Sequence, residues 1–211
     1  FITDAGHELK TPLTAISTSA DVLAMELENN EWIQNIQSQS TRMSKLIADL
    51  VTLSRLDEER PFLEMKEFSL SEAIWEISEP FLTLAEATGK EYVQHIEDNI
   101  NFIGDRNAIQ QMLSILLDNA NKYCETNGKI RLDVSKKRRK IEISVCNTCH
   151  ISTSENINRF FDRFYRSETS RNDRNSYGIG LSIAKSIAEN HNGTIRAESV
   201  ENSAISFIVT L

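Results

Sequence analysis

The chain has 211 residues, of which 40% are hydrophobic and 26% are charged, and its formal net charge is −8. This length and balance fit one large or two small globular domains. The negative charge disfavours nucleic acid as a partner, because a nucleic-acid binder needs a cationic face. The three cysteines, an odd number, indicate a reducing compartment without a disulfide framework. No apolar run reaches the roughly 18 residues of a membrane span.

Two helical patterns fill the first part of the chain and join near Asn29. In both helices the apolar residues follow a heptad-like repeat. In the first helix they are Ile2, Ala5, Leu9, Leu13, Ile16, Ala20, Leu23 and Leu27, and in the second Ile36, Met43, Leu46, Leu50 and Leu53. A hairpin of two helices cannot enclose its own apolar stripe, whereas two copies packed as a four-helix bundle can. The pattern therefore predicts a homodimer.

The first helix carries His7, with Glu8 beside it, Thr11 one turn later and Pro12 inside the helical pattern. At about 100° per residue, the His7 ring projects away from the apolar Leu9 and toward solvent, and Thr11 shares its face. A lone exposed histidine is usually an ordinary surface residue. Pro12 favours a functional interpretation, because a proline inside a helix predicts a kink and costs about 3 kcal/mol.

Pro61 marks a boundary, after which strands and helices mix. A strand is predicted at 62–68, a helix capped by a serine at 69–88, and extended segments at 92–96 and 101–103. A helix with Asp105 as its cap follows at 105–123.

The remaining pattern continues the mixture. Two alternating strands at 130–134 and 141–145 flank the basic run 136–140, which we interpret as a solvated hairpin turn. We then expect a short helix at 155–161, a polar stretch at 166–176, a helix at 179–190, and a last hairpin at 195–209. The predicted fold class is an all-α helical hairpin over 1–60, followed by an α+β two-layer sandwich over 61–211.

Two segments of the second part fit a phosphate ligand. Gly178 and Gly180 open a helix, where glycines let backbone N–H groups approach phosphate oxygens and the helix dipole favours an anion. Asn119 and Lys122 lie three residues apart near a helix end, so an amide and a lysine can hold a metal and a phosphate from one side. By itself a Gly-x-Gly is weak evidence for phosphate binding, and the alternative for Asn119 and Lys122 is an ordinary helix C-terminus, which commonly carries Asn and Lys.

The order and spacing of these segments resemble the catalytic core of sensor histidine kinases of two-component systems. FITDAGHELKTPLTAI is similar to the H-box of that family, and RMSKLIADLVTLSRLD to its second dimerisation helix. GDRNAIQQMLSILLDNANKY resembles the N-box, FFDRFYR the F-box and YGIGLSIAKSIAENHNG the G2-box. The resemblance implies a HisKA dimerisation and phosphoacceptor hairpin followed by an ATPase domain of the Bergerat (GHKL) type.

The resemblance also implies a two-step reaction with ATP and Mg²⁺ as cofactors. A ring nitrogen of His7 attacks the γ-phosphorus, and the phosphoryl group passes to an aspartate of a response-regulator receiver domain. Glu8 is then the general base, and Thr11 orients water for dephosphorylation of the regulator. Matching positions assign Asn119 to Mg²⁺ and the nucleotide, together with Lys122, Tyr123, Asn147, Arg163, Gly178, Gly180 and Leu181. Because family members commonly carry transmembrane sensors, we expect the cytoplasmic portion of a longer membrane protein.

Two departures from the family pattern affect the nucleotide site. Ile115 stands where the family has an asparagine, so one polar contact is lost. Asn147 replaces an aspartate that accepts the adenine amino proton, and an uncharged amide accepts that bond more weakly. Both glycines of the following loop are also missing. The alternative function is a dimeric docking and phosphatase module with weak ATP binding.

The altered loop also contains Cys146, Cys149 and His150 in the order Cys-x-x-Cys-His, the pattern of c-type haem attachment. A metal site or a redox thiol pair would use the same residues. Haem attachment belongs to an oxidising compartment, which the rest of the chain does not indicate. Chance variation in an altered loop is the simplest interpretation, and a redox or metal protein is the third hypothesis.

Overall fold

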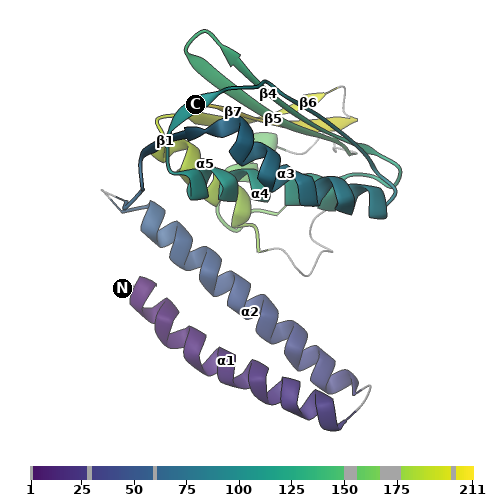
Figure 1. Cartoon of the computed structure of the whole chain (residues 1–211). Helices are drawn as coiled ribbons and strands as arrows, with labels where there is room; N and C mark the ends of the chain where they lie inside the picture. Colours follow the sequence, from purple (N-terminus) through teal and green to yellow (C-terminus); the bar gives the residue numbers. More distant parts are fainter. Residues whose placement is uncertain (1, 28–29, 59–60, 150–155, 167–176, 201–202) are drawn as a thin grey trace.

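The computed structural model describes residues 2–27, 30–58, 61–149, 156–166, 177–200 and 203–211, with side chains from residue 9 onward. The chain consists of a helical hairpin and a layered α/β part, which meet near the end of the second helix (Figure 1).

The hairpin consists of α1 (Ile2–Glu26) and α2 (Glu31–Leu56), which lie side by side (Figure 1). The side chain of Asn30 starts α2, because its Oδ1 accepts hydrogen bonds from Trp32 N at 3.0 Å and Ile33 N at 3.3 Å. These bonds satisfy two of the amides that a helix start leaves unpaired. The predicted hairpin is confirmed, and α1 continues through Pro12.

The apolar stripe of the hairpin is only partly covered within one chain. Leu13 and Ala20 are buried between the helices, whereas Leu9 and Ile16 are 53% and 50% exposed. An open apolar pocket of about 280 Å³ lies on this surface, and its lining includes Leu13, Ile16, Ile36 and Met43. A two-layer hairpin leaves such a stripe for a further layer of helices.

The α/β part places three helices against one face of a five-stranded sheet (Figure 1). The helices are α3 (Leu70–Ala87), α4 (Arg106–Tyr123) and α5 (Gly180–Asn190). The strand order is β2-β4-β5-β7-β6, in which β2 is parallel to β4 and the other pairs are antiparallel. The strands are β2 (Glu91–Ile96), β4 (Lys129–Lys137), β5 (Lys140–Thr148), β6 (Thr194–Val200) and β7 (Ala204–Thr210).

Three smaller elements complete this part. β1 (Lys66–Ser69) and β3 (Asn101–Gly104) pair as a separate two-stranded sheet, and η1 (Ile157–Phe161) is a short 3₁₀ helix. Both predicted caps are confirmed: Ser69 Oγ accepts from Glu72 N at 3.3 Å, and Asp105 Oδ1 accepts from Ala108 N at 3.0 Å.

The core lies between the helices and the sheet. Alternate residues of β5 are buried, because successive strand side chains point to opposite faces. On the helix side, the apolar face of α4 is fully buried, as shown by Ile109, Met112, Leu113, Leu116 and Leu117. This arrangement confirms the predicted α+β two-layer sandwich.

The predicted strand at 62–68 is wrong in its first half, because the strand is confined to Lys66–Ser69. Its partner β3 has only four residues, and these pair with residues 66–69. Residues 62–65 therefore have no strand to bond with in the described part of the chain, and Phe62 is 96% exposed. Apolar residues alone do not make a strand without a partner.

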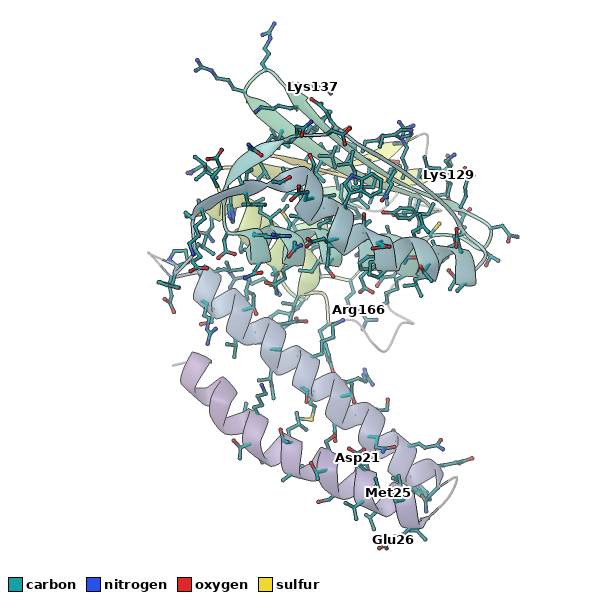
Figure 2. All side chains as sticks on the ribbon, in the orientation of Figure 1. Asp21, Met25, Glu26, Lys129, Lys137 and Arg166 are labelled. Carbon is teal, nitrogen blue, oxygen red and sulfur yellow. The ribbon has the colours of Figure 1, made fainter. Side chains whose placement is uncertain are left out.

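The basic run 136–140 is confirmed as a hairpin turn. Lys137 pairs with Lys140 across two turn residues, and Arg138 has a φ of +60°. Figure 2 shows Lys137 near the tip of this hairpin, far from α2.

The second half of α2 docks on the α/β part. Leu53 is 4% exposed and belongs to the main core, and Leu50 and Leu56 pack against it. Asn190 Nδ2, in the last turn of α5, donates to the Leu56 carbonyl at 3.0 Å. No helix within the described residues is long and apolar enough to cross a membrane.

Candidate functional site

One stripe of α4 faces the start of α5. Ile115 Cγ2 lies 3.3 Å from the place where Gly180 would carry a Cβ. Asn119 is one turn further along α4, so it shares the Ile115 face, and its side chain is half-buried. Lys122 and Tyr123 extend the stripe to the helix end, with Lys122 Nζ 5.5 Å from the Tyr123 ring centroid. The three predicted α4 residues thus continue the helix face that carries Ile115, and Ile115 is the residue of that face shown to pack against the start of α5.

The start of α5 has backbone amides that can bind an anion. Gly178 has a φ of +70°, and a Cβ there would collide with the Tyr165 carbonyl, so only glycine fits. Ile179 precedes the helix and gives it no side-chain cap among the described residues. The first N–H groups of α5 therefore receive no hydrogen bond from an N-cap side chain, and the helix dipole favours an anion at this end. Leu181, half-buried, lies in the same turn.

Asn147 lies on the helix-covered face of β5 and is 0% exposed. Its Nδ2 donates to the Thr148 carbonyl at 3.3 Å, while its Oδ1 has no hydrogen-bond partner in the described part of the chain. Its neighbours in register, Ile130 and Ile205, are apolar. An unsatisfied buried amide oxygen costs about 1–3 kcal/mol, and a ligand N–H would remove that cost. Asn147 therefore has a buried acceptor that lacks a partner among the described residues, and an adenine amino group is a donor of the matching kind.

The structure places Arg163 in a salt bridge at the end of α2. Its Nη2 donates to Asp57 Oδ1 at 2.7 Å and Oδ2 at 2.6 Å. The backbone next to Arg163 is fixed nearer the start of α5, because Phe164 N donates to the Gly178 carbonyl at 2.8 Å. The backbone beside Arg163 thus lies close to Gly178, but the Arg163 guanidinium is paired with Asp57 of the helical hairpin.

The predicted phosphoacceptor segment lies on α1. His7 and Glu8 belong to this helix, and their side chains lie outside the described residues, so the outward orientation of the ring stays a prediction. Thr11, one turn beyond His7, is exposed.

The thiols near the altered loop are poorly suited to redox chemistry. Burial raises the pKa of Cys146, and it raises the pKa of Cys149 to about 11. Both groups are therefore protonated near neutral pH, and the thiolate is the reactive form. Within the described residues no cluster of three His, Cys, Asp or Glu side chains can hold a metal, and His150 lies outside them.

Two polar residues at the junction of elements were not predicted from the sequence. His191 links two helix ends, because its Nε2 accepts from Asp105 N at 3.0 Å and its Nδ1 lies 2.8 Å from the Ile187 carbonyl. Asp57 holds Arg163, as described above. The one local signal for Asp57 is its position at a helix C-terminus, where an acid opposes the dipole and so needs a cation nearby.

Comparisons with known proteins show the family of the chain. The family model described as “Histidine kinase-, DNA gyrase B-, and HSP90-like ATPase” matches residues 104–211, and the model “His Kinase A (phospho-acceptor) domain” matches residues 1–59. “Sensor protein DltS” of Streptococcus agalactiae serotype III (strain NEM316) is 38% identical over 197 residues, which are 93% of this chain and 50% of that protein. The chain spans about half the length of the curated relatives it matches.

Two solved structures share the fold of nearly the whole chain. Full-length ShkA in complex with AMPPNP superposes with a TM-score of 0.83 at 18% identity, covering 99% of this chain and 44% of that one. Histidine kinase ThkA in complex with the response regulator protein TrrA superposes with a TM-score of 0.69 at 24% identity, covering 99% and 59%.

The chain belongs to the histidine kinase-, DNA gyrase B- and HSP90-like ATPase family, and its relatives make it the core of a two-component sensor histidine kinase. Its α/β part is an ATP-binding domain of that family. The resemblance in the motifs is therefore confirmed at the level of family and fold.

Proposed function

We propose that this chain transfers the γ-phosphoryl group of ATP to His7 and then to an aspartate of a response-regulator receiver domain. The observation that carries the proposal is the presence, in one chain, of a phosphoacceptor-type helix bearing His7 and an ATPase-family domain. The neutral imidazole is nucleophilic near pH 7, and Glu8 beside it is the general base for the ring proton. The complex of ThkA with the regulator TrrA supports a regulator as the partner.

The nucleotide contacts divide between the two sides of the site. Asn147 accepts the adenine amino hydrogen through its unpaired Oδ1, and Tyr123 and Leu181 line the base and sugar region. The amides that follow Gly178 and Gly180 and the ammonium of Lys122 neutralise phosphate charge. Because phosphoryl transfer needs little covalent help, positioning and charge neutralisation supply most of the acceleration.

Asn119 is the proposed protein ligand of Mg²⁺. Its half-buried amide offers an oxygen of the kind that Mg²⁺ prefers, on the α4 face that is turned toward the α5 start. Mg²⁺ commonly keeps several waters and is held by one or two protein groups together with substrate phosphates. The loss of an amide at Ile115 is compatible with that set. Bound Mg²⁺ would neutralise charge on the transferring phosphates.

We further propose that residues 1–60 act as the dimerisation and phosphotransfer unit and residues 61–211 as the ATP-binding unit. The open apolar pocket on the hairpin, with half-exposed Ile16 and Met43 in its lining, supports a second copy as its cover. Figure 2 shows Met25 and Glu26 at the end of the hairpin remote from the α/β part. A partner hairpin therefore has access to the stripe there without displacing the ATP-binding unit. Thr11, which is exposed on α1, is the residue that we assign to orienting water for dephosphorylation of the regulator.

Radiolabel transfer tests the proposal. The purified chain is incubated with γ-labelled ATP and Mg²⁺, and we expect acid-labile label on the protein that is lost in His7→Ala. His95→Ala is the matched control, since His95 is a 64% exposed histidine on β2 and should keep the label. No label on the unchanged chain at millimolar ATP, or equal label in His7→Ala, would refute the assignment.

A further inference from the structure

The Arg163 side chain is paired with Asp57 at the end of α2. This position is near the C-terminal end of α5, whereas the proposed phosphate site is at its N-terminal end. Asp57 directly follows Leu56, whose carbonyl is bonded to Asn190 in the last turn of α5. The backbone amides proposed to bind phosphate begin at Gly180, the first residue of α5. Gly180 is about 15 Å from Asn190 along the helix at a rise of 1.5 Å per residue. A guanidinium paired with Asp57 is therefore held near the opposite end of α5.

Two features fix the carboxylate of Asp57 in this position. Asp57 is the C-terminal cap of α2, and its backbone N–H donates to the Leu53 and Arg55 carbonyls. Leu53 is itself buried in the core of the α/β part, so the end of α2 does not move independently of that part. The negative end of the α2 dipole adds to the attraction of the carboxylate for a cation.

The salt bridge is nevertheless weak enough to be exchanged. The side chains of Arg163 and Asp57 are 52% and 38% exposed, and ion pairs in such contact with water stabilise little. A phosphate offers the same planar guanidinium a two-point, charge-assisted contact with more negative charge. The backbone of the neighbouring Phe164 is already bonded to Gly178. The backbone beside Arg163 therefore lies next to the start of α5, although the guanidinium itself is held by Asp57.

We propose that Asp57 is a positioning residue that competes with the nucleotide phosphates for the Arg163 guanidinium. In the nucleotide-free chain Asp57 holds the side chain on α2, and phosphate binding releases it. The proposal rests on the proposed function, since it assumes that Arg163 binds ATP phosphates. It assigns Asp57 a role in nucleotide affinity although Asp57 belongs to the helical hairpin.

Calorimetric titration of the dimeric chain with ATP and with adenosine tests the competition. Asp57→Asn keeps the shape of the side chain and removes its charge, so we expect ATP to bind about two- to fivefold more tightly, the range that corresponds to an exposed ion pair. Adenosine, which has no phosphate, should bind equally to both proteins. When the rate of His7 labelling is measured for Asp57→Asn, the KM for ATP should fall by the same factor and kcat should stay unchanged. Asp57→Glu, which keeps the negative charge, should have the KM and kcat of the unchanged chain.

Asp162→Asn is the matched control. Asp162 is adjacent to Arg163 in sequence and is also a half-exposed aspartate, but it pairs with Arg159 at 3.3 Å. Removal of its charge should change ATP affinity less than removal of the Asp57 charge. The Asp57→Asn effect should also vanish in an Arg163→Ala background.

Three outcomes would overturn the role of Asp57. They are unchanged ATP affinity in Asp57→Asn, an equal gain in Asp162→Asn, and a gain that persists in Arg163→Ala, which would indicate a general charge effect. Failure of the unchanged chain to bind ATP would instead refute the proposed function, and the inference with it. The two failures are therefore distinguishable.

Discussion

The buried amide of Asn147 gives the most direct test of the nucleotide site. Its Oδ1 has no partner among the described residues, and its side chain is 0% exposed. Asn147→Asp replaces a neutral acceptor with a charged one of the same shape. Neutral hydrogen bonds contribute about 0.5–1.5 kcal/mol and charged ones about 1.5–3 kcal/mol, so the gain toward an adenine amino group is about 1 kcal/mol, or about fivefold in affinity.

The same substitution should destabilise the chain when no nucleotide is bound. A carboxylate at this position would lie between the apolar register neighbours Ile130 and Ile205, and burying a charge among apolar groups is costly. We therefore expect a lower Tm for Asn147→Asp without ATP, and a larger rise of Tm on adding ATP than in the unchanged chain. Calorimetry with ATP and thermal melts with and without ATP measure both effects.

Asn121→Asp is the control for this test. Asn121 is 5% exposed and its Oδ1 likewise has no partner in the described part of the chain, but it is not a proposed adenine contact. Its variant should lower Tm and leave ATP affinity unchanged. If Asn147→Asp binds ATP no more tightly than the unchanged chain, the adenine contact at Asn147 is refuted.

Two further predictions concern Gly178, which precedes α5, and Cys149 in the altered loop. Gly178→Ala should lower the free energy of unfolding, measured in urea, by more than Gly89→Ala. Both glycines have φ near +70°, a conformation that costs an alanine about 1–2 kcal/mol, but only at Gly178 would the new Cβ collide with a backbone carbonyl. Equal losses in the two variants would contradict the reasoning. The rate of alkylation of Cys149, monitored by mass spectrometry, should be low at pH 8. It should rise about tenfold per pH unit toward the pKa of about 11, because only the thiolate reacts. A rate that levels off near pH 8 would contradict the raised pKa.

Features that depend on neighbours in the sequence were predictable. The spacing of apolar residues predicted the helices. Ser69 and Asp105, which precede α3 and α4, act as caps because a short side chain reaches backbone amides two or three residues away. The strand at 62–68 failed for the opposite reason. Strand formation depends on a partner, and β3 ends before it can pair with residues 62–65.

The altered position Ile115 shows how much of a site a single sequence can define. The family pattern indicated that a polar group is missing there, and the structure adds what replaces it, since the Ile115 side chain packs on Gly180 at the start of α5. The position therefore remains part of the site surface while losing its ability to hold water or a metal. Such a replacement favours a site in which Asn119 alone supplies the amide oxygen from α4.

The Arg163–Asp57 contact was beyond prediction because it joins residues 106 apart in the chain. Nothing in the local sequence of either residue specifies the other, and the contact exists because Leu53 carries the end of α2 into the core of the α/β part. The resemblance to the family assigns Arg163 to phosphate, and the docked helix gives it Asp57 as a partner. If Asp57 competes for the guanidinium as proposed, nucleotide affinity depends partly on the helical hairpin, although the contacts proposed for the nucleotide all lie in the α/β part.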